Sequence, residues 1–271
     1  MDEMMYPTVS VAIPAYNAEK YIYQTLDSVV RQSYKGVIET VITDDCSTDG
    51  TADIIFDFIK SHEGIENRTF YYIKNEKNSG VCVSRNRAVQ KCSGEYLCYL
   101  DADDIWDERK VEAQIEQVGT YKKRSEYDSV SMPVIFATGR ECINENGEPA
   151  GISMHIPKIV HYKDMLRTNY IPCSSVMLER SVAMEFPMER DDMAEDYITW
   201  LKIIKKYGPA ACIDEPLLKY RLTGTGRSSD KLKTTRMHYK ALRYVGTGRL
   251  ASVKCTLSYM IYGLKKYSKK K

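Results

Sequence analysis

Residues 95–104 read EYLCYLDADD, a short apolar run that ends in closely spaced acids. The run from Tyr96 to Leu100 has the length and composition of a buried strand. Carboxylates at the end of such a strand place hard oxygen ligands together, and these ligands suit Mg²⁺ or Mn²⁺. The tetrapeptide 101–104 could equally be a solvated turn that begins a helix, because Asp is common in both places. The sequence on either side of it decides between the two interpretations.

Three units of strand and helix precede this stretch. Strand patterns cover residues 8–13, 37–42 and 70–73, and each is followed by apolar residues at helical spacing, around 22–30, 54–59 and 81–92. We expect Gly94 to cap the third helix. Strands that alternate with helices in this way predict an α/β fold with a mainly parallel, Rossmann-like sheet flanked by helices. Such sheets bind ligands at the carboxyl ends of their strands.

A second pair of acids, Asp44 and Asp45, also ends a strand in the same half of the predicted sheet. The carboxyl ends of parallel strands meet at one edge, so both acidic groups are expected to converge on one pocket. Without a functional reason, this arrangement would only create like-charge repulsion. The two pairs together favour a binding site over a solvated turn.

The second half of the chain changes its pattern. After a helix that carries Val111, Ile115 and Val118, residues 130–137 and the Asn146-Gly147 turn indicate antiparallel pairing, which makes the distal half α+β. A helix over about 195–207 ends at Gly208, and a strand follows to Tyr220. Residues 223–231 are polar and rich in Gly and Ser, which predicts a mobile loop before two C-terminal helices.

Composition excludes several classes of protein. The net charge of +2 gives no reason to expect a nucleic acid partner. No apolar run is long enough to span a membrane, and the acidic start at Asp2 and Glu3 contradicts a secretory signal, so we expect a cytoplasmic protein. The cysteines are scattered without a CxxC pair, which predicts reduced thiols rather than disulfides or a zinc site.

Five ordered motifs carry a resemblance to a known family. They are VSVAIPAYN at 9–17, DDCSTD at 44–49, GVCVSRN at 80–86, LDADD at 100–104, and a distal group with Glu195-Asp196, Trp200-Leu201, DEPL at 214–217 and Tyr220-Arg221. Their order and spacing resemble family 2 glycosyltransferases, including the teichuronic-acid-type subgroup that builds bacterial surface polysaccharides. The resemblance covers residues 8–230 and implies a GT-A fold. It divides residues 1–225 into a nucleotide-binding half (8–105) and an acceptor half (106–225), followed by a loop and helical extension over 226–271.

The resemblance also implies roles for individual residues. The implied donor-binding residues lie at the strand ends: Pro14, Ala15, Tyr16, Asp45, Arg85, Asp101 and Ala102. Of these, Asp45 would accept a hydrogen bond from a uracil-like base, and Arg85 would lie near the base or the diphosphate. Asp103 would hold Mn²⁺ or Mg²⁺ on the diphosphate. Taken alone, each residue has a plainer interpretation, such as Tyr16 in the core or Arg85 on a solvated helix face.

The same resemblance bears on the start of one helix and on one turn. Glu195 and Asp196 begin a helix, where the helix dipole favours the anion, so either could be a plain N-terminal acid or a catalytic base. The resemblance favours Asp196 as the base, with Asp191, Asp192 and Glu195 as rivals. Cys46 stands where the family usually has Gly, which puts the backbone geometry of that turn in question.

The implied activity is transfer of a sugar from a nucleoside diphosphate, expected to be UDP, to a hydroxyl of a glycan or lipid-linked acceptor. One metal ion and one base suffice, and direct displacement inverts the anomeric centre. A sugar-phosphate nucleotidyltransferase is an alternative, but it would need a Gly-rich basic loop where residues 14–17 read PAYN. A catalytically silent nucleotide-sugar-binding subunit of a polysaccharide assembly complex is the alternative from another class.

The C-terminus suggests a place for the enzyme. Between Val253 and Tyr267, Leu257, Met260, Ile261 and Leu264 follow helical spacing, and five lysines lie within 265–271. This pattern predicts reversible attachment to an anionic membrane surface, on the inner face of the plasma membrane. The alternative is that the apolar stripe packs on the catalytic domain. We also expect the loop over 223–231, with Arg227, to fold over a bound diphosphate.

Overall fold

A computed structural model describes residues 6–128, 132–224 and 230–268. The strands are β1 (Val9–Ala15), β2 (Ile38–Asp44), β3 (Arg68–Lys74), β4 (Tyr96–Tyr99), β5 (Ile105–Trp106), β6 (Ile135–Ile143), β7 (Pro149–Met154), β8 (Ile159–Val160), β9 (Met177–Glu179) and β10 (Ala210–Arg221). The helices are α1 (Ile22–Val30), α2 (Thr51–Ser61), α3 (Val81–Lys91), α4 (Lys110–Asp128), α5 (Tyr162–Met165), α6 (Arg180–Glu185), α7 (Glu195–Tyr207), α8 (Lys231–Tyr244) and α9 (Arg249–Ser268).

The strands form a continuous mixed sheet with the order β3-β2-β1-β4-β9-β6-β10-β5. Strands β1 to β4 pair in parallel, which confirms the prediction for the first half. In the distal half, β9 runs antiparallel to both β4 and β6, and β6 and β7 form the predicted hairpin. β6 and β10 nevertheless run parallel to each other. The division at about residues 105 and 225 stays a prediction, since the sheet runs through both halves.

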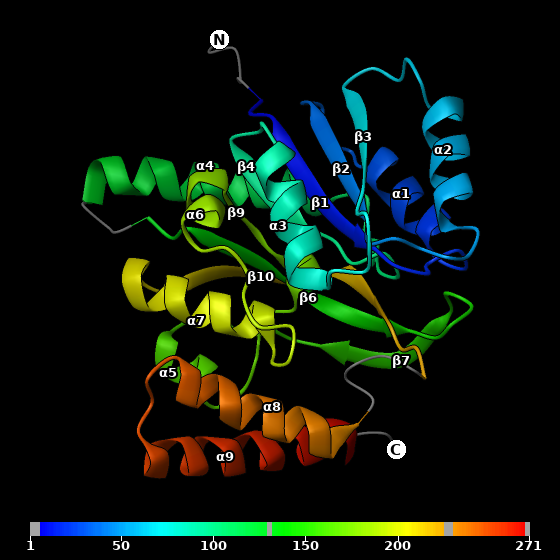
Figure 1. Cartoon of the computed structure of the whole chain (residues 1–271). Helices are drawn as coiled ribbons and strands as arrows, with labels where there is room; N and C mark the ends of the chain where they lie inside the picture. The colour runs from blue at the N-terminus through cyan, green and yellow to red at the C-terminus, as the bar shows by residue number, and fades with distance from the viewer. Residues whose placement is uncertain (1–5, 129–131, 225–229, 269–271) are drawn as a thin grey trace.

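Helices cover both faces of the sheet (Figure 1). Side chains of β1 alternate between two cores: Val11 and Ile13 pack with α1, α2 and α4, whereas Ala12 packs with α3, α6 and α7. This alternation follows from the period of two in a strand. Burial on both faces also explains why β1 reads as a nearly continuous apolar run.

The prediction for Gly94 was wrong. Helix α3 ends at Lys91, and Cys92 caps it in an extended conformation with ψ of 142°. The Gly94 N–H instead donates to Ser10 Oγ at 2.8 Å, and a Cβ at this position would lie 2.7 Å from the carbonyl oxygen of Thr8. Gly94 is therefore required for the close approach of two backbones before β4, not for a helix end.

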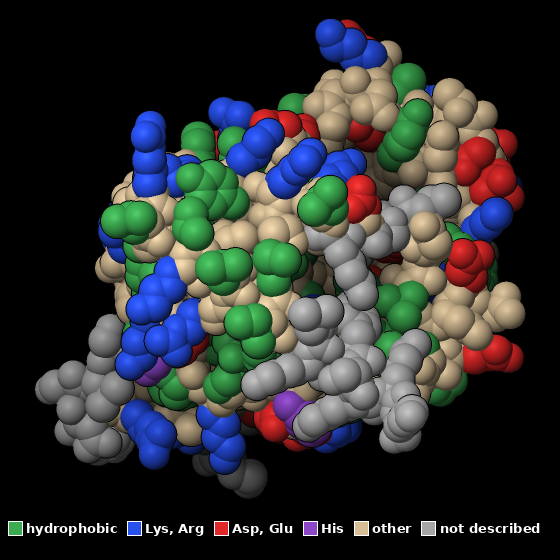
Figure 2. All heavy atoms as spheres, turned by 90° about the horizontal axis from the view of Figure 1, so that it is seen from below, with side chains coloured by type: hydrophobic (Ala, Val, Ile, Leu, Met, Phe, Trp, Pro, Cys, Tyr) green, Lys and Arg blue, Asp and Glu red, His purple; other side chains and the backbone are tan. Residues whose placement is uncertain are grey.

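The two C-terminal helices lie antiparallel beneath α7 (Figure 1). Three residues of the predicted apolar stripe, Leu257, Met260 and Ile261, are exposed and do not pack on the catalytic domain. Figure 2 shows hydrophobic side chains on this face. The side chain of Leu264 and the lysines within 265–271 lie outside the described side chains, and the loop residues 225–229 with Arg227 lie outside the described residues. No helix in the described ranges is long and apolar enough to cross a membrane.

Candidate active site

The acidic turn 101–104 is held rigidly at the end of β4. Its first N–H, on Asp101, donates to Ser174 Oγ at 3.1 Å, and the Asp104 N–H donates to the Asp101 carbonyl at 3.1 Å. The Thr25 hydroxyl on α1 lies 2.9 Å from the carbonyl oxygen of Ala102, whose side chain is buried. The backbone of the turn is therefore fixed by contacts with two other parts of the chain.

The three carboxylates of this turn have different environments. Asp104 is buried and accepts the Arg221 N–H at 3.0 Å, and its Oδ2 has no hydrogen-bond partner in the described part of the chain. Burial and the carboxylates of Asp103 and Asp101 raise the pKa of Asp104 well above its usual range, which disfavours its charged form. Burial and the Asp101 carboxylate raise the pKa of Asp103 to about 6. A cation beside Asp103 would relieve both effects.

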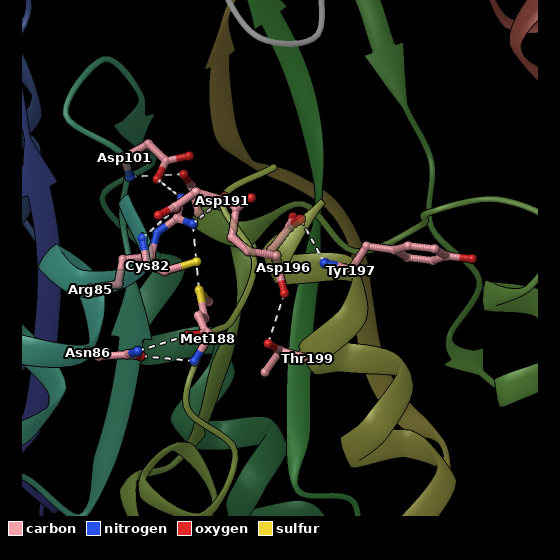
Figure 3. Close-up of polar contacts among 11 residues, drawn as sticks. Cys82, Arg85, Asn86, Asp101, Met188, Asp191, Asp196, Tyr197 and Thr199 are labelled. Atoms are coloured by element: carbon pink, nitrogen blue, oxygen red, sulfur yellow. Dashed lines mark hydrogen bonds and ion pairs between the residues drawn. The ribbon is translucent and has the colours of Figure 1, made fainter. Parts of the chain in front are cut away.

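Arg85 on α3 connects this turn to another part of the chain (Figure 3). One guanidinium nitrogen lies 2.5 Å from Asp101 Oδ1 and the other lies 2.8 Å from Glu195 Oε1. The side chain is only 4% exposed. Burial opposes the charge, but Asp101 and Glu195 hold the pKa of Arg85 well above its ordinary value. The arginine is therefore a permanent cation shared by two acids.

Glu195 and Asp196 open α7 at this junction. Glu195 is buried against Arg85, and its carbonyl accepts the Thr199 hydroxyl at 2.9 Å. Asp196 Oδ1 accepts the Tyr197 N–H at 2.7 Å. Burial and the Glu195 carboxylate raise the pKa of Asp196 to about 6. A carboxylate with such a pKa is suited to act as a general base near neutral pH.

The rivals of Asp196 are committed elsewhere. Asp191 accepts the Cys82 N–H at 2.9 Å in the first turn of α3. Asp192 is exposed and pairs with Arg190 at 2.8 Å, which lowers the pKa of Asp192. Glu195 is held in the pair with Arg85. Asp196, by contrast, lies next to the Arg85 bridge with its pKa raised to about 6, which makes it the preferred candidate.

Asp45 organises the loop that precedes α3. Its Oδ1 accepts Asn75 Nδ2 at 2.6 Å and the Ser79 N–H at 2.8 Å, and its Oδ2 accepts the Gly80 N–H at 2.8 Å. The carboxylate is buried. Three hydrogen bonds leave little acceptor capacity on this side chain, so the contact with a nucleotide base stays a prediction.

The end of β1 lies directly beside Asp45. The Ala15 carbonyl accepts the Asp45 N–H at 2.8 Å, and Pro14 pairs in register with Thr43 of β2. Ala15 is buried, whereas the Tyr16 ring is 48% exposed. The structure thus brings Pro14, Ala15 and Tyr16 to the same sheet edge as Asp45, with the Tyr16 ring accessible to a ligand.

Cys46 adopts the left-handed conformation, with φ of 63°. Its thiol makes only a weak contact, 3.7 Å from the Glu76 carbonyl. This conformation costs a residue with a Cβ roughly 1–2 kcal/mol, part of which glycine loses again through its freedom in the unfolded chain. Cys46 therefore occupies a backbone conformation that favours glycine, as its replacement of the usual Gly led us to ask.

Cys46→Gly should raise the free energy of unfolding by about 0.5–1 kcal/mol, because glycine adopts the left-handed region without strain. Urea denaturation measures the difference. Cys46→Ala is the matched control, since it removes the thiol but keeps the Cβ, and it should give no gain. An equal gain from both variants would trace the effect to the thiol rather than to φ.

Sequence reasoning gave no role to Arg221, which the structure places under the acidic turn. Its Nε donates to the Asp103 carbonyl at 2.7 Å, its Nη1 to the Glu145 carbonyl at 2.9 Å, and its Nη2 to Gln24 Oε1 at 2.7 Å. The guanidinium carbon lies 4.7 Å from the centre of the Tyr21 ring. A buried arginine at the last position of β10 therefore joins three elements to the turn. The sequence pointed to it only as part of the distal motif with DEPL and Tyr220-Arg221, without a role.

Comparison with known proteins identifies the family of the chain. The family model for glycosyl transferase family 2 matches residues 10–135. The chain is 35% identical to Bacillus subtilis TuaG, named as a teichuronic acid biosynthesis glycosyltransferase, over 94% of each chain. It is 32% identical to Escherichia coli WfaP, a UDP-Glc:α-D-GlcNAc-diphosphoundecaprenol β-1,3-glucosyltransferase, over 96% of this chain and 95% of WfaP.

Solved structures show the same fold. Staphylococcus aureus TarS (residues 1–349) in complex with UDP-GlcNAc superposes with a TM-score of 0.67 at 18% identity, over 93% of this chain and 71% of TarS. The Pyrobaculum calidifontis mannosyltransferase PcManGT, in complex with GDP-Man and Mn²⁺, gives 0.64 at 18% identity, over 94% and 69%. The sheet is thus of the GT-A type. From the sequence relatives and the ordered motifs together, the chain belongs to glycosyl transferase family 2.

Proposed function

We propose that the enzyme transfers a sugar from a UDP-linked donor, with inversion, to a hydroxyl of a glycan or lipid-linked acceptor in bacterial surface polysaccharide synthesis at the cytoplasmic face of the membrane. The observation that carries the proposal is the Arg85 bridge, which joins Asp101 of the acidic turn to Glu195 beside Asp196. The bridge would hold the proposed donor-binding turn and the proposed base in a fixed relative position. The UDP-sugar named for WfaP and the UDP-GlcNAc bound to TarS support the donor class.

The residues of the acidic turn fit a divalent cation. Asp103, and Asp101 beside it, offer hard oxygen ligands, and the raised pKa of Asp103 shows a carboxylate that a positive charge would stabilise. No cluster of three or more His, Cys, Asp or Glu side chains within the described ranges forms a complete metal cage. Mg²⁺ and its relatives at phosphates need only one or two carboxylates, with the donor's oxygens completing the sphere. When bound, the ion would neutralise charge on the departing diphosphate.

The chain's own residues would perform the remaining steps. Asp196 would accept the proton of the acceptor hydroxyl as its oxygen attacks the anomeric carbon, while the bond to the diphosphate breaks on the opposite side. Attack from the opposite side inverts the anomeric centre. Arg85 would act as a positioning residue, because its terminal nitrogens already bind Asp101 and Glu195. Pro14, Ala15, Tyr16 and Asp45 would enclose the nucleotide base.

A donor panel tests the proposal. UDP-Glc, UDP-GlcNAc and UDP-GlcA, with GDP-Man as the contrasting nucleotide, are incubated with Mn²⁺ and a GlcNAc-diphosphate-lipid acceptor, and nucleotide release is measured. We expect UDP release that requires both acceptor and metal, and NMR of the product should show a β linkage from the α-linked donor. Release of no nucleotide from any donor, with UDP still bound, would favour the silent binding subunit.

Asp103→Asn should stabilise the metal-free protein at pH 8 by on the order of 2 kcal/mol. Since the folded pKa of about 6 lies above the ordinary 3.8, the charged form is disfavoured in the folded state and stability falls as the pH rises through 6. The gain should vanish below about pH 4, where the Asp103 carboxyl is neutral in both the folded and the unfolded protein. Urea denaturation in EDTA measures it, with Asp57→Asn, an exposed carboxylate on α2, as control.

Mn²⁺ with UDP should then stabilise the wild type more than Asp103→Asn, and equal stabilisation of both would place the metal elsewhere.

A further inference from the structure

Helix α9 turns polar side chains toward the protein and apolar side chains toward solvent, the reverse of an ordinary amphipathic helix. Its inward side carries the buried residues Ser252 and Thr256. Its outward side carries apolar residues at helical spacing, with exposed fractions of 89% for Leu250, 55% for Leu257 and 56% for Ile261. A surface helix normally turns its apolar stripe toward the core. We call the set Leu250, Val253, Leu257, Met260 and Ile261 the outer face of α9.

The charge of the same region is strongly one-sided. Twelve of the 39 Lys and Arg residues, and none of the 37 Asp and Glu residues, follow Asp230. The 230 residues up to that point therefore hold 27 basic and 37 acidic residues, a net charge of −10, whereas the C-terminal hairpin of α8 and α9 with its tail carries +12. The overall charge of +2 conceals this separation.

Basic and apolar side chains occupy one surface. A groove of about 410 Å³ between the two helices is lined by Arg236 and Lys240 of α8 and by Val253 and Leu257 of α9. Both basic side chains are exposed. Figure 2 shows hydrophobic side chains gathered on this side of the molecule with Lys and Arg side chains around them. The surface therefore places exposed apolar side chains next to basic ones.

The hairpin is firmly seated on the catalytic domain, so this surface has a fixed direction. His238 of α8 is buried between Tyr197 of α7 and Tyr259 of α9, with ring centroids 5.3 and 4.3 Å away. Its Nε2 lies 3.2 Å from the Tyr197 hydroxyl. Burial lowers the pKa of His238 to about 4, so the ring stays neutral and the contact holds at physiological pH. The outer face of α9 consequently points away from the domain.

We infer that the outer surface of the C-terminal hairpin docks on an anionic lipid bilayer, with the outer face of α9 in the headgroup layer and the cations of α8 and α9 at the lipid phosphates. A helix with an apolar face flanked by Lys and Arg lies in the interface plane of such a membrane. A second copy of the chain fits this surface poorly, because it would bring +12 against +12. A membrane supplies both the negative charge and the apolar layer.

The attachment would also orient the enzyme. In Figure 1, β1 and β2 run from the end near the N-terminus toward the side on which α8 and α9 lie. Their carboxyl ends, where the candidate site is built, thus face the docking side. Lipid binding needs neither donor nor metal, so its failure would leave the proposed transfer reaction untouched, and the reverse holds as well.

Vesicle co-sedimentation of the full chain tests the inference. The vesicles contain equal parts of phosphatidylglycerol and phosphatidylcholine, or phosphatidylcholine alone, at low and at high salt. We expect binding to the anionic vesicles, at least tenfold weaker binding in high salt, and little binding to the neutral ones. Full binding to neutral vesicles, or none to anionic ones at low salt, would overturn the inference.

Two double variants at exposed positions separate the electrostatic from the apolar contribution to vesicle binding. Arg236→Gln with Lys240→Gln should weaken anionic-vesicle binding about 30-fold, as expected for two cations near the surface. Leu257→Ser with Ile261→Ser should weaken it at least tenfold and more so in high salt, where only apolar insertion remains. Lys60→Gln with Lys77→Gln, and Ile65→Ser with Met184→Ser, are the matched controls at exposed positions elsewhere and should bind like the wild type.

Other outcomes would assign the surface differently. If the double variants in α8 and α9 bind vesicles as tightly as the control variants, the hairpin is not the docking surface. If Leu257→Ser with Ile261→Ser instead converts a dimer to a monomer in size-exclusion chromatography while vesicle binding is unchanged, the outer face of α9 is an interface between copies. Circular dichroism of each variant verifies that the fold is intact, which is expected because the substituted side chains are solvent-exposed.

Discussion

Replacing Asp196 by Asn should lower kcat for sugar transfer by about 10²–10⁴-fold, the usual contribution of a general base. The amide keeps the shape of the carboxylate and loses its basicity. Donor affinity should change little, because the base acts on the acceptor hydroxyl rather than on the nucleotide. Steady-state kinetics give kcat, and titration of UDP in the presence of Mn²⁺ gives the donor Kd.

Asp192→Asn is the matched control for this variant. It makes the same substitution four residues earlier, on an exposed carboxylate that pairs with Arg190, and kcat should stay near that of the wild type. If Asp196→Asn instead loses donor affinity in proportion to its rate, Asp196 belongs to donor binding, and Glu195 becomes the candidate base.

The pH profile of the wild type should show the same group. With the pKa of Asp196 raised to about 6, the base is protonated at pH 5 and ionised at pH 7.5, so kcat/KM should rise through about pH 6 and then level off. Asp103 has a pKa near the same value without metal. Saturating Mn²⁺ should remove its contribution and leave the slope of a single group. A flat profile from pH 5 to 8 would contradict a carboxylate base.

Much of the fold could be predicted because its signals are local. The strand and helix patterns before Asp101 alternate within short windows, and they correspond to β1 through β4 and the helices between them. The end of α7 at Tyr207 followed from Gly208, which adopts φ of 98°. The pattern could not show that β6 and β10 run parallel. Their pairing joins two segments that lie far apart in the sequence, and a local pattern does not report such a contact.

The candidate site was predictable as a list of residues but not as an arrangement. Arg85 and Glu195 are separated by 110 positions, and no periodicity indicates that they form an ion pair. The sequence predicted Arg85 beside the diphosphate or on a solvated face, whereas the structure buries it between two acids. The same limit applies to α9: helical spacing identified an apolar stripe, but only the packing of Ser252 and Thr256 showed that it points outward.

The Arg85 bridge should be the most sensitive structural point of the site. Arg85→Met should lower the free energy of unfolding by about 3–5 kcal/mol, because it leaves the buried Glu195 carboxylate without its cation. Urea denaturation at pH 7.5 measures the loss. Arg109→Met breaks an exposed pair with Glu215 and serves as the control, which should change stability very little.

Glu195→Gln separates the positioning role of the bridge from its structural role. Arg85 keeps Asp101 as its partner in this variant, so the stability loss should be clearly smaller than for Arg85→Met. The Glu195 carboxylate is also the charge that raises the pKa of Asp196 most, after burial. Its removal should lower this pKa and move the rise of kcat/KM to lower pH, with burial still holding the pKa above the ordinary value. A purely structural Glu195 would lower stability without moving the pH profile. The shift of the profile, rather than the loss of stability, is therefore the measurement that decides whether Glu195 tunes the base.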